Sequence, residues 1–249
     1  VDLGRGVALF AILGDLGLVL VEILGGIFAV RVLIPLPALV TVHTIDRLLR
    51  MDAAPPPVLF WALRRGRGNV VVATRFQFRL HALATVTGGM LILPATPDVV
   101  ASFVAAAEAA PEEVSTIANV MPAPPLPFVP EEHHGQLVVL AMLVHSGATD
   151  DGQRALAPFR DLAPPIADLV RPMPYPEIYP PEQEGSHPAT TPHTMFVERI
   201  GDPEAETILE HLERSTAMMG VAQLRVLGGA MARVPTDATA FAHRKSRIM

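Results

Sequence analysis

The sequence predicts an α+β fold in which helices cover one face of an antiparallel sheet. The first observation is that strand-like and helix-like segments follow one another from residue 84 onward, mostly with short loops between them. The second is the segment 74–81, where Phe76, Phe78 and Leu80 alternate with polar side chains. A period of two residues is that of a strand with one buried face.

The expected elements follow from local pattern, and the chain divides into a first domain over 1–83 and a second over 84–249. Thr96 offers an N-cap for the first helix of the second domain, and Asp150 with Asp151 caps the next helix. In order, the second domain is expected to contain a strand (85–94), a helix (97–110), a strand (114–121), a Pro-rich loop (122–135), a strand (136–145), a helix (151–162), a long loop (171–193), a strand (194–200), a helix (204–218) and a strand (221–228).

Composition excludes several classes of function. Half of the 249 residues are hydrophobic, so the chain can bury a sizeable core, in which Met218, Met219 and the stretch 90–93 are expected. The net charge of −6 argues against a general nucleic-acid binder. The chain has no cysteine, which excludes disulfides, cysteine-ligated metals and thiol catalysis, and no GxSxG motif supports a serine hydrolase.

The apolar segment Val7–Val30 allows two interpretations. Its 24 residues are long enough to span a bilayer as a helix. Asp15 and Glu22 interrupt it, and a central Asp costs about 2.5–3.5 kcal/mol on insertion scales. The other interpretation is a Gly-punctuated strand and loop region of a soluble domain. The residues alone leave both interpretations open.

A glycine-rich turn, GRGN at 66–69, is followed by a strand. Glycines let the backbone approach a phosphate or a flat ring, and exposed amides can then donate hydrogen bonds to it. The turn is neither a P-loop nor a dinucleotide fingerprint, and a plain loop is the alternative. Arg64, Arg65 and Arg67 beside it would contact phosphates or form a solvated edge.

Two other clusters carry reactive side chains. The run 131–134 reads Glu-Glu-His-His, but adjacent side chains on a strand point in opposite directions, so no metal site is expected there. Tyr175 and Tyr179 lie in a Pro-rich loop with Glu177, His187 and His193, where acid–base chemistry and simple packing are the alternatives. From this loop chemistry we expect Tyr175, Glu177 and Tyr179 to lie near a substrate pocket.

The string LFWALRRGRGNVVVATRFQFRLH, residues 59–81, resembles the bacterial FAD-linked oxidases of the vanillyl-alcohol oxidase and berberine bridge enzyme superfamily. The family pattern there is approximately DLFWALRGGGGNFGVVTRFxFRLHP. The matching residues are Phe60, Trp61, Ala62, Leu63, Arg64, Gly66, Gly68, Asn69, Val72, Thr74, Arg75, Phe76 and Phe78. Segments after residue 84 look like the substrate domain of the same subfamily.

The resemblance implies an FAD-dependent oxidoreductase, in which a hydride passes from a small organic substrate to flavin and oxygen reoxidises the flavin. The fold it implies is the remnant of a PCMH-type FAD-binding domain followed by an antiparallel-sheet substrate domain. The cofactor-binding residues it implies are Gly25, Gly26, Gly66, Gly68, Asn69, Val72 and Thr74. It places no catalytic residue and no metal. It also makes the segment Val7–Val30 look like the end of an FAD domain rather than a membrane helix.

The sequence departs from the family pattern at several positions. Arg65 and Arg67 stand where the family has glycine, and Val70 with Val71 replaces Phe-Gly. The family's first half and its closing Asn-Pro-x-Asn-x-Phe segment are expected to be missing. The alternative function is therefore a non-catalytic α+β binding or dimerisation module without flavin. The expected partner is a small-molecule substrate, with no nucleic acid or membrane, in the cytoplasm.

Overall fold

The computed structural model describes residues 9–13, 18–22, 29–32, 40–44, 47–51, 61–62, 73–76, 85–179, 190–217 and 219–249. They belong to two compact units, which are described separately. The first unit comprises residues 1–82 and 234–244, and the second comprises residues 83–233 and 245–249. The assignment of a cofactor role to one unit and a substrate role to the other stays a prediction.

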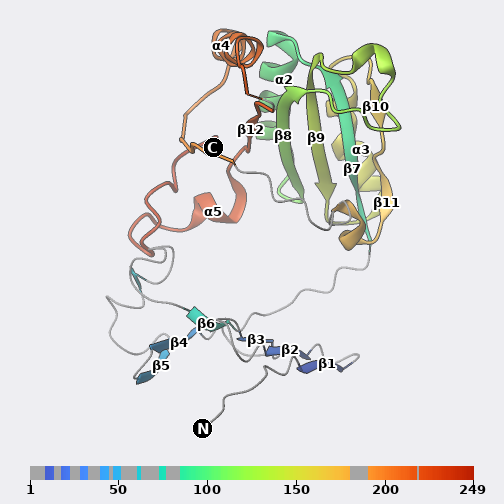
Figure 1. Ribbon diagram of the computed structural model, residues 1–249. Helices are drawn as coiled ribbons and strands as arrows, with labels where there is room; N and C mark the ends of the chain where they lie inside the picture. The colour runs from blue at the N-terminus through green and yellow to red at the C-terminus, as the bar shows by residue number, and fades with distance from the viewer. Residues whose placement is uncertain are drawn as a thin grey trace. The chain divides into compact units, whose positions relative to one another are not determined.

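The second unit is built on a six-stranded antiparallel sheet (Figure 1). Its centre consists of β7 (Val86–Pro94), β9 (Leu137–His145) and β8 (Val114–Pro122), which lie side by side in that order. The short strands β10 (Ala167–Asp168) and β11 (Arg171–Met173) pair with the outer edge of β7, and β12 (Ala222–Leu224) pairs with β8.

Helices cover one face of this sheet (Figure 1). They are α2 (Pro97–Ala109), α3 (Thr149–Arg160) and α4 (Asp202–Glu213). The rings of Phe103 on α2 and Phe159 on α3 are fully buried, with centroids 5.1 Å apart. They pack on alternate strand residues, such as Leu91 and Leu143, because side chains on a strand alternate between its two faces. The expected α+β class, with helices on one face of an antiparallel sheet, is confirmed.

The helix termini follow local chemistry in two cases of three. Thr96 caps α2, and its hydroxyl accepts a hydrogen bond from the Val99 N–H, as expected. At α4 the Glu204 carboxylate accepts from the Gly201 N–H at 2.8 Å, which lowers the pKa of Glu204 below its usual range. The expected capping of α3 by Asp150 and Asp151 is wrong, because α3 begins at Thr149, two residues before the expected start, and its N-cap is Ala148.

Several expected elements differ from the structure. The loop expected over 171–193 begins with β11 and a 3-10 helix, η3 (Tyr175–Ile178). The strand expected over 194–200 is reduced to one bridge between Val197 and Ile248. The helix expected to reach residue 218 ends at Glu213, and the last expected strand shrinks to β12, followed by the short helix α5 (Gly229–Arg233). Two further short pieces, η2 (Glu131–His133) and β10, were not expected.

The expected core is also corrected at one position. Residues 91–93 are buried as expected, and Met90 is half-buried. Met219 is exposed, so its expected place in the core is wrong. Met218 lies outside the described residues.

The first unit contains two small antiparallel sheets among its described residues. One consists of β1 (Leu9–Leu13), β2 (Leu18–Glu22) and β3 (Ala29–Val32), and the other of β4 (Val40–Thr44), β5 (Arg47–Met51) and β6 (Ala73–Phe76). The described parts of the apolar segment 7–30 are thus strands, and the membrane-helix alternative is wrong for them. No helix in the described part of the chain is long and apolar enough to cross a bilayer.

Within the same unit, a late segment of the chain returns to an early one. The indole N–H of Trp61 donates to the carbonyl oxygen of Asp237 at 2.5 Å, and the Ala240 N–H donates to the carbonyl oxygen of Trp61 at 3.4 Å. The first of these bonds connects residues 176 positions apart. Trp61, one of the residues that match the family pattern, is therefore hydrogen-bonded to Asp237 and Ala240.

Candidate functional site

The sheet face opposite the helices is partly open. Three apolar residues lie across it in one row: Met90 on β7 is directly opposite Met142 on β9, which is directly opposite Ile117 on β8. All three are half-buried, whereas the residues before and after Met142 on β9, Ala141 and Leu143, are fully buried beneath the helices. We call Met90, Met142 and Ile117 the methionine strip. It is an apolar surface on the three central strands of the sheet.

Two covers border the strip on the same face. On one side, Val129 from the Pro-rich loop after β8 packs against Ile92 and Leu140. On the other side, Ile178 from η3 packs with Val86 and Met173, and Met142 contacts this cluster. Met90 packs against the first cluster and Met142 against the second, so the strip lies between the two covers and stays half-buried.

Polar side chains occupy one end of this face, on β8 and β12. The side chain of Asn119 accepts a hydrogen bond from Gln223 at 2.8 Å and donates to the carbonyl oxygen of Leu140 at 3.5 Å. Gln223 in turn accepts from the guanidinium of Arg225 at 2.9 Å. The amides and the guanidinium thus satisfy one another beside the apolar strip.

A pair of tyrosines lies at the other end, with Tyr175 at the start of η3 and Tyr179 directly after it. The hydroxyls of Tyr175 and Tyr179 are 2.9 Å apart, and their rings meet edge to face with centroids at 5.8 Å. The hydrogen bond to Tyr179, with a smaller effect of burial, raises the pKa of Tyr175 above its usual value. η3 rests on the same sheet face as the strip, and the expectation that Tyr175, Glu177 and Tyr179 lie near a substrate pocket stays a prediction.

The other members of the expected acid–base cluster are not brought to the tyrosine pair. Glu177 forms an ion pair with Arg171 at 3.0 Å instead. His193 is exposed, and no contact joins it to either tyrosine among the described residues. His187 lies outside the described residues.

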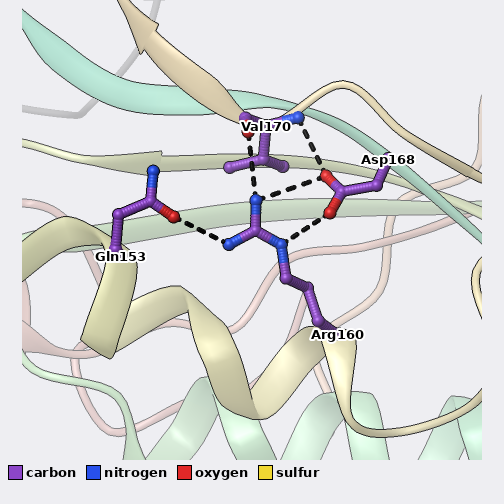
Figure 2. A network of polar contacts seen from close by, with 4 residues as sticks. All are labelled: Gln153, Arg160, Asp168 and Val170. Carbon is purple, nitrogen blue, oxygen red and sulfur yellow. Dashed lines mark hydrogen bonds and ion pairs between the residues drawn. The ribbon is translucent and has the colours of Figure 1, made fainter.

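A polar network links α3 to the edge strand that pairs with β7 (Figure 2). The Arg160 guanidinium donates to Asp168 at 2.6 Å, to Gln153 at 3.0 Å and to the carbonyl oxygen of Val170 at 3.0 Å. Asp168 also accepts from the Val170 N–H at 3.0 Å. The network ties the helix to the strand segment 167–173, which runs beside β7 next to Met90.

Close approach at this edge requires glycine. Gly89 has φ of 146°, and a Cβ there would overlap the carbonyl oxygen of Leu169. The Leu169 N–H donates to the Met90 carbonyl oxygen at 2.8 Å, so the strands touch through their backbones at this point. A side chain at position 89 would push the strand 167–173 away from β7.

Most residues expected to bind a cofactor lie outside the described residues: Gly25, Gly26, Gly66, Gly68, Asn69 and Val72. Thr74 is the exception, since it falls within β6. The pairing of β6 with β4 passes from Arg75 directly to Ala73, so the register skips Thr74. Such bulges are common next to functional sites, because they redirect one residue of a strand.

No group of three or more His, Asp or Glu side chains in the described part of the chain can hold a metal ion. In the run 131–134, the His134 imidazole lies 3.0 Å from the carbonyl oxygen of Val129. The sequence carries no signal for one further polar feature. His145 is buried at the end of β9 and lines a pocket of about 620 Å³ on the helix face, together with Glu113, Asp151 and Arg154. The side chains of Asp151 and Arg154 already pair with each other there.

The fold resembles solved structures of oxidoreductases. 6-hydroxy-D-nicotine oxidase from Arthrobacter nicotinovorans matches 77% of this chain at 16% identity with a TM-score of 0.58. GilR, an oxidoreductase that catalyses the terminal step of gilvocarcin biosynthesis, matches 85% at 17% identity with a TM-score of 0.60. Xylooligosaccharide oxidase from Myceliophthora thermophila C1, solved with xylobiose, matches 84% at 21% identity with a TM-score of 0.57.

The chain spans about half the length of these structures, between 44% and 50% of each. No family model matches the sequence, and no curated protein matches it. The likeness, at 16%, 17% and 21% identity, therefore concerns the fold alone.

Proposed function

We propose that this chain functions as an FAD-dependent oxidoreductase of the oxidase type, in the berberine bridge enzyme-like subfamily. A bound flavin would supply the hydride acceptor and the route of electrons to oxygen. The substrate is a small organic molecule. The observation that carries the proposal is the fold likeness to three oxidoreductases, which covers at least 77% of the chain and so includes residues of both units.

Two features of this chain support flavin binding. The string 59–81 matches the family's pattern at thirteen named positions, with Gly66, Gly68 and Asn69 in the turn. At its end, the register of β6 skips Thr74, a place where a strand commonly redirects a residue toward a ligand. We assign contact with the flavin to Gly25, Gly26, Gly66, Gly68, Asn69, Val72 and Thr74.

The second unit supports the substrate role in the proposal. The open face of its sheet combines the methionine strip with the tyrosine pair at one end and the Asn119–Gln223 pair at the other. An apolar surface bordered by a few polar groups is the composition of a small-molecule site. The chain's own residues would bind the substrate, orient it and exclude water from it.

Titration of the purified chain with FAD, followed by flavin fluorescence, tests the proposal. We expect saturable quenching. Gly68→Val should weaken binding about tenfold, equivalent to about 1.4 kcal/mol, because a side chain there blocks the approach of the backbone. Gly228→Val is the matched control, because nothing lies within 4 Å of a Cβ at that position.

A second variant tests the departures from the family pattern. Arg65→Gly and Arg67→Gly, combined with Val70→Phe and Val71→Gly, restore the family loop and should bind FAD more tightly. If the wild-type chain is folded by circular dichroism and quenches no flavin fluorescence, the oxidase proposal fails. The chain would then be a non-catalytic α+β binding module.

A further inference from the structure

The pocket beside His145 has no part in the proposed function. It lies within the second unit, between the segments 111–113 and 145–147 and the first turns of α3. Its volume of about 620 Å³ is that of a small-molecule site. We propose that this pocket binds a small zwitterion, a molecule that carries both a carboxylate and an ammonium group, as a free amino acid does.

One wall of the pocket is the imidazole of His145, which is only 4% exposed. Its Nδ1 is fully buried and has no hydrogen-bond partner among the described residues. A Cβ at Gly152 would lie 3.1 Å from Nδ1 and 2.5 Å from the hydroxyl oxygen of Thr87, so both residues are close to this nitrogen. Both donate elsewhere, the Gly152 N–H to the carbonyl oxygen of Ala148 and the Thr87 hydroxyl to that of Thr149.

The buried Nδ1 decides which ring nitrogen donates to the pocket. A buried N–H without an acceptor is rare in proteins, so the neutral imidazole carries its proton on Nε2. Nε2 is the ring nitrogen that is not fully buried. Gly147 leaves this part of the ring open, because a Cβ there would lie 2.7 Å from Cε1. His145 therefore offers an N–H donor, which suits the oxygen of a carboxylate.

Arg154 supplies a positive charge to the same pocket. Its ion pair with Asp151 joins two exposed side chains, and such pairs contribute little stability. The carboxylate of a ligand can therefore replace Asp151 at the guanidinium, which binds carboxylates through two parallel hydrogen bonds. Nε2 of His145 and Arg154 are the donors for the carboxylate of the zwitterion.

Glu113 supplies the negative charge that an ammonium group needs. Its carbonyl oxygen accepts from the Ser146 N–H at 2.9 Å, which holds the segment 111–113 against the turn after β9. Its carboxylate lines the pocket and forms no ion pair with a described residue. With Glu113 and Asp151 negative and Arg154 positive, the lining has a net charge of −1. This charge opposes a simple anion, whereas a zwitterion places its ammonium group at Glu113.

NMR of the histidine rings tests the proposal on the full chain. The nine histidines are labelled with ¹³C at Cε1, and His145→Gln identifies the signal of His145. The probes are free glycine, β-alanine and 4-aminobutyrate, which differ in the separation of their two charges. Propionate and ethylamine carry one charge each and are the matched controls. Calorimetry on the same samples gives the dissociation constants, so the result does not depend on the folding of His145→Gln.

We expect at least one zwitterion to bind in a saturable way and to shift the His145 signal, with smaller changes at the other histidines. Propionate and ethylamine should each bind at least about threefold more weakly. Glu113→Gln should weaken binding of the zwitterion at least about threefold and leave propionate binding no weaker. Arg154→Gln should weaken both ligands, whereas Arg199→Gln, an exposed arginine in another ion pair of the same unit, should weaken neither.

The proposal is overturned if none of the three zwitterions shifts the His145 signal, or if propionate binds as tightly as the best of them. It is also overturned if Arg199→Gln weakens binding as much as Arg154→Gln, because net charge alone would then explain the effect. The FAD titration is a separate test, since no residue of this pocket is assigned to the flavin. Either proposal can therefore fail while the other holds.

Discussion

Replacing Arg160 tests most directly what binds the edge segment 167–173 to α3 (Figure 2). Its guanidinium donates to Asp168, Gln153 and the carbonyl oxygen of Val170. Hydrogen bonds to charged groups contribute about 1.5–3 kcal/mol each, and they are not additive. The Arg160 and Asp168 side chains are 24% and 31% exposed, so water replaces part of what is lost. We therefore expect Arg160→Ala to lower the free energy of unfolding by about 2–3 kcal/mol.

The matched control lies on the same helix. Arg154 pairs with Asp151, but these side chains are 73% and 58% exposed, and Arg154→Ala should cost about 0.5 kcal/mol or less. Arg160→Lys keeps the charge and loses the planar fork, so it should fall between wild type and Arg160→Ala. Urea unfolding followed by circular dichroism measures all three variants. Equal midpoints for Arg160→Ala and Arg154→Ala would refute the reasoning.

Two further predictions concern the same face of the sheet. Gly89→Ala should lower the free energy of unfolding by about 2–4 kcal/mol, because the new side chain meets an unfavourable φ and overlaps the backbone of Leu169. Urea unfolding measures the effect, with Gly228→Ala as the control. Equal unfolding midpoints for the two variants would contradict the account. The chain has two tyrosines, so the ultraviolet absorbance of phenolate reports on this pair. Tyr179→Phe should move the titration of Tyr175 to lower pH, because the hydrogen bond that raises the pKa of Tyr175 is lost. Because the pKa of Tyr175 is raised in the folded state, this bond stabilises the fold at pH below the unfolded pKa, and the stabilisation is lost as pH rises through the folded pKa. If Tyr175 titrates at the same or a higher pH in Tyr179→Phe than in the wild type, the pair does not form.

The central strands and the first helix were predictable because their signals are long and local. The apolar runs at 86–94 and 137–145 are apolar on both faces, as expected for strands covered by helices on one side and loops on the other. Thr96 and Pro97 mark the start of α2 by their own chemistry.

The elements that were missed depend on tertiary contacts. The segment 171–173 reads as a loop because of its proline, yet it pairs with β7 at the edge of the sheet, where a residue without an N–H is tolerated. The segment 194–200 contains Thr, Phe, Val and Ile, which are common in strands, but only Val197 forms a bridge, to Ile248 near the end of the chain. Local composition does not reveal whether a partner strand is present.

The candidate site was only partly predictable for a similar reason. The tyrosine pair is visible in the sequence, since both residues lie on one short stretch four positions apart. The methionine strip is not, because Met90, Ile117 and Met142 come from three strands far apart in sequence, and the register decides that they meet. The resemblance at 59–81 identified the proposed cofactor loop independently of any contact.

The central claim is that this chain holds a flavin, and the visible absorption spectrum of the purified protein tests it most directly. The protein is incubated with FAD, desalted and measured, and circular dichroism of the same sample shows that it is folded. The account predicts flavin absorption that stays with the protein in a one-to-one ratio. A folded protein that emerges colourless would contradict it.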